Sequence, residues 1–141
     1  MEKEPRLADQ IFQAAIEAFV AEVNAGLIEQ ALSRLTDDVV IVEDIPPFRW
    51  AGPDAGGQWL EAMRANARKA GIEVVTMTLG APMRLESEGA AGYAVYSAAL
   101  RMTGDGIDLR ADGMLSFVLR RPDEHWQISA LTWSGPEPQP A

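Results

Sequence analysis

The run Val39-Val40-Ile41-Val42-Glu43-Asp44 marks the point where a helical pattern gives way to a strand. Its β-branched residues favour extended backbone, and Pro46-Pro47 then turn the chain away, because proline cannot continue a strand ladder. The predicted strand therefore ends in a carboxylate, and Asp44 is our candidate for a catalytic base that faces a cavity. Glu43 should face the other way, since successive strand side chains alternate, and a register shift of one residue would exchange the two roles.

Two amphipathic stripes precede this strand. In the first, apolar residues recur at three- and four-residue steps, as in a helix buried on one face, at Ile11, Phe12, Ala15, Ile16, Phe19, Val20 and Val23. Asn24-Ala25-Gly26 is a helix stop, and a shorter stripe follows between Leu27 and Leu35. A third helix is predicted to begin at Gly52-Pro53-Asp54 and to end at Gly71. Its expected buried residues are Trp59, Leu60, Met63 and Ala67.

From Ile72 onward, β-branched and aromatic residues cluster between turn signals. Strands are predicted at residues 72–79, 83–87, 93–102, 108–120 and 126–133. Gly104-Asp105-Gly106 and Pro122-Asp123-Glu124 fit tight connections between them. Three helices followed by a run of strands indicate an α+β fold, with the helices on one face of an antiparallel sheet that curls into a cone. We expect one domain over residues 1–134 and a proline-rich, mobile tail over residues 135–141.

Composition narrows the possible functions. The chain has 141 residues, a formal net charge of −9 and no cysteine. The negative charge opposes the phosphate backbone, so nucleic-acid binding is not expected. The lack of cysteine excludes disulfides, a thiolate nucleophile and sulfur-based metal sites. Residues 1–5 lack a signal-peptide pattern and no apolar run is long enough to span a membrane, so we expect a cytoplasmic protein that does not bind membranes.

Several short patterns occur in an order that covers nearly the whole chain. They are Phe19-Val20-Ala21-Glu22-Val23-Asn24-Ala25-Gly26, Leu35-Thr36-Asp37-Asp38, Val42-Glu43-Asp44, Gly52 followed by Trp59, Asp112-Gly113-Met114-Leu115-Ser116-Phe117 and Trp126-Gln127-Ile128. In this order the sequence resembles the NTF2-like superfamily, especially its SnoaL-like and ketosteroid-isomerase-like branch. The resemblance implies a cone-shaped fold with a pocket between the curved sheet and its helices. It also implies homodimers that form through the outer face of the sheet.

The resemblance matches Asp44 to the proton-shuttling aspartate of the isomerase, with a difference of one residue in strand length. Other positions depart from that enzyme. Phe19 stands in the place of the oxyanion tyrosine, Leu60 in that of a supporting tyrosine, and Met114 nearest to the protonated acid. Asp112, two residues away on the same strand face, is a weaker substitute for that acid. Losing one oxyanion donor costs about 3 to 4 kcal/mol of transition-state stabilisation, so ordinary steroid isomerisation is not expected.

The remaining candidates are aromatic or ionisable residues. Trp133 matches an aromatic residue that lines the cavity in this branch, and Trp50 lies beside the proline-rich loop. The predicted ligand pocket therefore consists of Phe19, Trp50, Leu60, Asp112, Met114 and Trp133. Asp44 also has a structural interpretation, in which it caps local amides or pairs with Arg49. The single histidine, His125, lies in a predicted turn without a second histidine or a cysteine nearby, so neither a metal site nor a serine hydrolase is predicted.

Two hypotheses follow from these residues. In the first, the cone binds a small, largely apolar or amphipathic molecule, and Asp44 moves a proton in an isomerase, cyclase or lyase reaction that needs no cofactor. In the second, the sheet face forms a homodimer or binds another protein, and side chains fill the cone. The first predicts a small molecule in the pocket, whereas the second predicts a closed interior.

Overall fold

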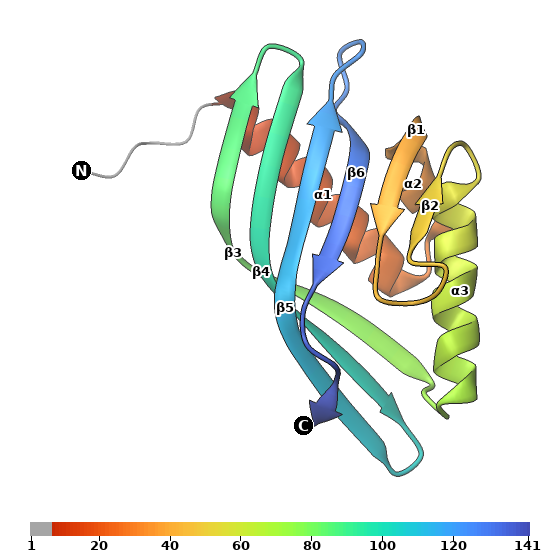
Figure 1. Ribbon diagram of the computed structural model, residues 1–141. Helices are drawn as coiled ribbons and strands as arrows, with labels where there is room; N and C mark the ends of the chain where they lie inside the picture. Colours follow the sequence, from red (N-terminus) through yellow and green to blue (C-terminus); the bar gives the residue numbers. More distant parts are fainter. Residues whose placement is uncertain (1–6) are drawn as a thin grey trace.

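Residues 7–141 are described by the computed structural model, in which three helices accompany one curved sheet (Figure 1). The elements are α1 Leu7–Ala25, α2 Ile28–Ser33, β1 Leu35–Val42, β2 Arg49–Ala51, α3 Ala55–Lys69, β3 Val74–Glu88, β4 Ala91–Gly104, β5 Ile107–Arg120, β6 Gln127–Ser134 and β7 Gln139–Pro140. Residues 1–6, which include the stretch used for the signal-peptide prediction, lie outside the described residues. None of the described helices is both long enough and apolar enough to cross a membrane.

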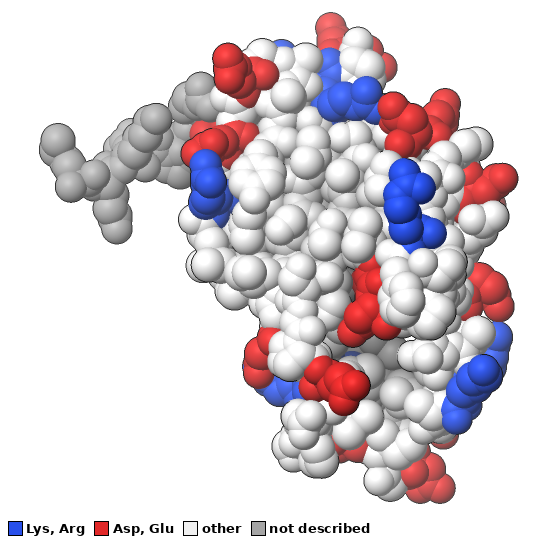
Figure 2. All heavy atoms as spheres, in the orientation of Figure 1, with Lys and Arg blue, Asp and Glu red and all other residues white. Residues whose placement is uncertain are grey.

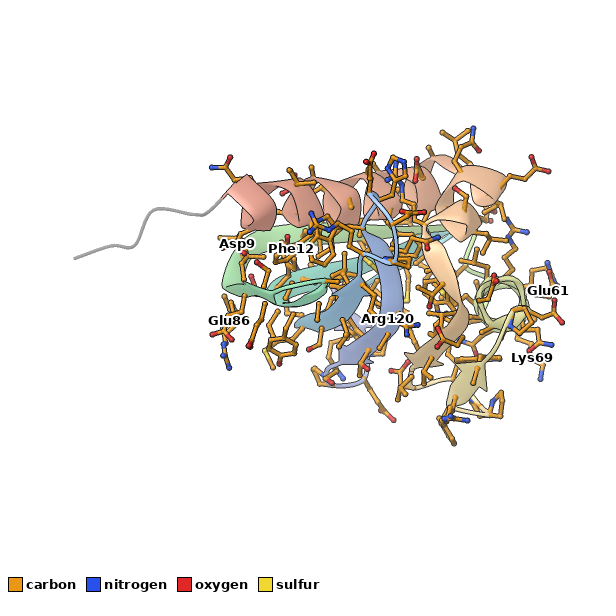
Figure 3. All side chains as sticks on the ribbon, turned by 90° about the horizontal axis from the view of Figure 1, so that it is seen from above. Asp9, Phe12, Glu61, Lys69, Glu86 and Arg120 are labelled. Carbon is orange, nitrogen blue, oxygen red and sulfur yellow. The ribbon has the colours of Figure 1, made fainter. Side chains whose placement is uncertain are left out.

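The sheet has the strand order β2-β1-β6-β5-β4-β3, and β7 pairs with β5. Neighbouring strands are antiparallel, as the sequence predicts, except β1 and β6, which run parallel. No hairpin fixes the direction of β1 relative to β6, because most of the chain lies between them. α1 covers one face of the sheet, and Phe12 points from α1 toward it (Figures 1 and 3). The predicted α+β arrangement is confirmed.

The strands of the structure differ from the predicted strands in two places, because segments that were predicted to be loops belong to strands. β3 is a single strand of 15 residues where two were predicted. Its pairing with β4 shifts between Leu79 and Pro82, so the expected break is a bulge inside the strand. The proline- and glycine-rich loop contains β2, in which Trp50 lies opposite Ile41 of β1. This three-residue strand was not predicted.

The carboxyl-terminal segment, which the sequence predicts to be extended and mobile, forms the short strand β7 beside β5. Gln139 lies opposite Arg110 of β5. The N–H of Ala141 donates to the carbonyl of Asp108 at 2.9 Å, which Pro140 itself cannot do. The segment is therefore held along β5, beside the hollow side of the sheet.

The core lies between the helices and the inner face of the sheet. Its largest fully buried side chains include Trp59, Tyr96, Phe12, Phe117, Ile16 and Ile41. Phe19 of α1 stacks on Trp59 of α3, with 6.3 Å between ring centroids. The amide of Asn24 donates to the carbonyl of Met77 at 2.8 Å and accepts from its N–H at 3.0 Å, which fixes the end of α1 to β3. These contacts place α1 and α3 at the border of the space that the curved sheet leaves open.

Gly56 and Gly57, in the first turn of α3, test how closely this helix packs. A Cβ at Gly56 would lie 2.5 Å from Cδ1 of Leu35 and 2.6 Å from Cδ2 of Leu32, whereas nothing lies within 4 Å of one at Gly57. We expect Gly57→Ala to raise the free energy of unfolding by about 0.5–1 kcal/mol, because alanine loses less backbone entropy in a helix. Gly56→Ala should lower it by about 1–3 kcal/mol, because packed side chains must move. Urea unfolding measures both, and equal effects of the two variants would contradict the close packing.

Candidate functional site

A pocket of about 400 Å³ opens between α3, the strands β3 to β5 and the carboxyl-terminal segment. Its wall is mainly apolar, with Met63, Ala67, Leu100, Ala111 and Trp133, and its acidic side holds Glu43, Asp44 and Glu137. Figure 2 shows this face of the molecule hollowed between acidic side chains. A hollow of this size and lining fits a small organic molecule.

The alternation of side chains along β1 decides which acid enters the molecule. Val39, Ile41 and Glu43 are buried, at 1%, 0% and 5% exposure, whereas Asp44 is exposed. The N–H of Glu43 donates to the carbonyl of Phe48 at 3.1 Å. The inward and outward alternation of side chains along β1 therefore continues to Glu43. Glu43 is therefore the acid that points into the core, while Asp44, the candidate base from the sequence, also lines the pocket. The register in which the two acids exchange roles is the observed one, and Asp44 lies at the exposed edge of the pocket.

The environment of Glu43 changes its acidity. Its pKa is raised from 4.5 to about 7, mainly because burial disfavours the charged carboxylate. The negative charge of Asp44 raises this pKa further, whereas the indole N–H of Trp59 lowers it. Within residues 7–141, neither Oε1 of Glu43 nor Nε1 of Trp59 has a hydrogen-bond partner in good geometry. A pocket carboxyl group that changes charge near neutral pH and has an unused oxygen can exchange a proton with a bound molecule.

Comparison with known proteins identifies the fold. No protein-family model and no curated protein matches the sequence. The hexachlorocyclohexane dehydrochlorinase LinA-type3 from Novosphingobium barchaimii LL02 is similar with a TM-score of 0.77 and 12% identity, over 95% of this chain and 90% of that one. A proposed scytalone dehydratase from Novosphingobium aromaticivorans DSM 12444 has a TM-score of 0.76 and 10% identity, over 94% and 86%. An NTF2-like protein of unknown function from Pseudomonas putida KT2440 has a TM-score of 0.74 and 18% identity, over 92% and 87%. The chain has the NTF2-like fold.

The NTF2-like resemblance expected from the sequence is thus confirmed at the level of the fold. Within this NTF2-like fold, the predicted pocket residues separate into groups. Trp133 lines the pocket, and Leu60 lines a second hollow beside α3. Phe19 and Trp50 are buried in the core, at 2% and 6% exposure, and line neither hollow. Both side chains belong to the hydrophobic core, where Phe19 stacks on Trp59, so their role as pocket walls stays a prediction.

Asp112 and Met114, the other two predicted pocket residues, are exposed and lie outside this pocket. Asp112 is exposed and forms an ion pair with Arg110 at 3.0 Å, and Met114 is 41% exposed. In the observed register Leu115, and not Met114, lies opposite Trp133. A shift of one residue along β5 therefore turned both predicted side chains to the wrong face of the sheet.

His125 lies in the exposed turn where the sequence placed it. Its backbone N–H donates to Oδ1 of Asp123 at 2.8 Å, as in a turn stabilised by an aspartate side chain. Among residues 7–141, no group of three or more histidine, aspartate or glutamate side chains is arranged to hold a metal ion.

Proposed function

We propose that this NTF2-like protein binds a small, largely apolar molecule in the pocket and that Glu43 moves a proton in an isomerase or lyase reaction without a cofactor. The observation that carries the proposal is a buried carboxyl group, with an unpaired oxygen and a pKa raised to about 7, on the wall of a mainly apolar pocket. A base whose pKa lies near the working pH combines a useful fraction of the reactive form with a strong tendency to take the proton. Cytoplasmic residence stays part of the proposal, since a chain without cysteine needs no oxidising compartment.

The reaction begins with the ionised form of Glu43. Its carboxylate takes a proton from a carbon next to a carbonyl, and the electron pair of that C–H bond moves into an enolate. In an isomerisation, Glu43 returns the proton to another carbon. In an elimination, the electron pair expels a leaving group from the neighbouring carbon, and the proton stays on Glu43 until water removes it.

The enolate needs a hydrogen-bond donor, since donors aimed at the developing negative charge often supply most of the transition-state stabilisation in reactions of this kind. The tyrosine positions of the isomerase hold Phe19 and Leu60 in this chain. Among the residues that line the pocket, Asn66 of α3 has a side-chain amide and Trp133 an indole N–H. These two side chains are the donors that we assign to the developing oxyanion.

Proton exchange tests the proposal without knowledge of the natural substrate. ¹H NMR in D₂O would follow deuterium entering cyclohexanone, acetophenone and 2-octanone, with the buffer rate subtracted. We expect a protein-dependent rate that rises with pH around a midpoint near 7. In Asp44→Asn this midpoint should move to lower pH, because the charge of Asp44 raises the pKa of Glu43. A rate equal to that of buffer for all three ketones would reject the proposal.

A second candidate function is a homodimerisation or protein-interaction module. The outer face of the sheet exposes Tyr93 opposite Val118, with Met114 further along β5, at 39%, 38% and 41% exposure. An apolar patch of this kind favours a partner surface. Light scattering would report the mass of one or two 15.3 kDa chains, and a dimer with no exchange activity would favour this function.

A further inference from the structure

A second hollow, of about 310 Å³, lies on the other flank of α3. Met63, Ala67, Ile72, Val75 and Leu100 line both this hollow and the pocket of Glu43. These five side chains therefore form a common wall between the two hollows.

The period of α3 explains this arrangement. Met63 and Ala67 lie four residues apart and form the middle stripe of the helix, which faces both hollows. On one flank of this stripe, Asn66 borders the pocket of Glu43. On the other flank, Arg64 and Arg68 border the second hollow.

The linings of the two hollows differ in charge. The first carries Glu43, Asp44 and Glu137, whereas the second carries two arginines and Glu73. A hollow with two arginines in its lining is a local exception in a chain with a net charge of −9. It offers an attractive site for an anion at a distance from the acidic opening.

Arg64 is the group available to bind such an anion. Arg68 already pairs with Glu61 at 3.3 Å on the outward side of α3, where Figure 3 shows Glu61 and Lys69. The side-chain amide of Asn24, which also lines this hollow, makes both of its hydrogen bonds to the backbone of Met77. Within residues 7–141, no ion pair involves Arg64.

We propose that the two hollows join into one slot that binds an amphipathic carboxylic acid, with its carboxylate on Arg64 and its apolar body between α3 and β3–β4, pointing to Glu43. This inference rests on the proposed function and names its substrate class. A guanidinium group can bind a carboxylate through two parallel hydrogen bonds. The acidic opening repels the same carboxylate, so the ligand has one favoured direction and presents a neutral carbon to Glu43.

Octanoate, 1-octanol and octylammonium are matched probes, because they share a chain length and differ in the charge of the head group. Calorimetric titration at pH 7.5 should give tightest binding for octanoate. Arg64→Met should weaken octanoate at least about tenfold, since a hydrogen-bonded charge pair is lost, and should leave 1-octanol within about twofold. Arg68→Met is the matched control on the same flank and should weaken octanoate less, because Glu61 already engages Arg68.

The outcomes separate this inference from the proposed function. Equal binding of octanoate and 1-octanol, with no effect of Arg64→Met, would overturn the carboxylate assignment and leave ketone exchange by Glu43 as an independent result. Tightest binding of octylammonium would also overturn it, because the ligand would then point the other way. Glu43→Gln should retain octanoate binding, since it removes a repelling charge, and a tenfold loss there would contradict the proposed direction.

Discussion

Replacing Glu43 with glutamine should slow the protein-dependent exchange of ketone protons by at least about 100-fold. General acid–base catalysis by a positioned side chain contributes about 10²- to 10⁴-fold, and glutamine keeps the size of glutamate without a carboxylate. Since Glu43 is 5% exposed, bulk solvent does not readily replace it. The rate is measured by ¹H NMR at pH 8, where the wild-type side chain, with a pKa of about 7, is mostly ionised.

Glu86→Gln is the matched control for this substitution. It makes the same chemical change in an exposed pair with Arg84, at the end of the molecule opposite Lys69 of α3 (Figure 3). We expect it to retain the wild-type exchange rate. If Glu43→Gln exchanges at the wild-type rate while Asp44→Asn loses activity, Asp44 is the base, and the proposed role of Glu43 is wrong.

The helices and their ends could be predicted because their signals are local. Gly26 and Gly71 have φ angles of 75° and 74°, and each follows the end of a helix, as their positions in the sequence indicated. Which side chains of β1 face inward, by contrast, could not be predicted from neighbouring residues. All four residues 39–42 are apolar, so period-two alternation could not show which of Glu43 and Asp44 faces inward. The phase depends on packing of Ile41 against the core and on pairing with β2.

The same limit explains the errors on β5. Asp112 and Met114 are separated from Trp133 by the turn at Pro122-Asp123-Glu124, and the sequence does not fix the strand pairing across that turn. The observed register places Leu115 opposite Trp133, and Ala111, four residues before Leu115, therefore shares its face and lines the pocket. The sequence could thus predict that these strands border a cavity. Which side chains face the cavity depends on the pairing register between β5 and β6, and a register shift of one residue exchanges them.

The free energy of unfolding should fall by about 2–3 kcal/mol between pH 5 and pH 8 because of Glu43. Its pKa is about 7 in the folded chain against an ordinary value of 4.5. Between these values the unfolded chain releases the proton while the folded chain retains it, so rising pH favours unfolding. The fall begins near 4.5 and levels off above about 7, where Glu43 is ionised in both states. Urea unfolding followed by tryptophan fluorescence measures this change.

Glu43→Gln should remove most of this pH dependence, because glutamine does not ionise in either state. The carboxylates of Asp38 and Asp108 do not interfere, since their pKa values are lowered from 3.8 and their stabilisation is lost below this range. Glu86→Gln should follow the wild-type curve. If the free energy of unfolding changed with pH in the same way for wild type and Glu43→Gln, folding would leave the pKa of Glu43 unchanged. The proposal that Glu43 is a base with a pKa near neutral pH would then be wrong.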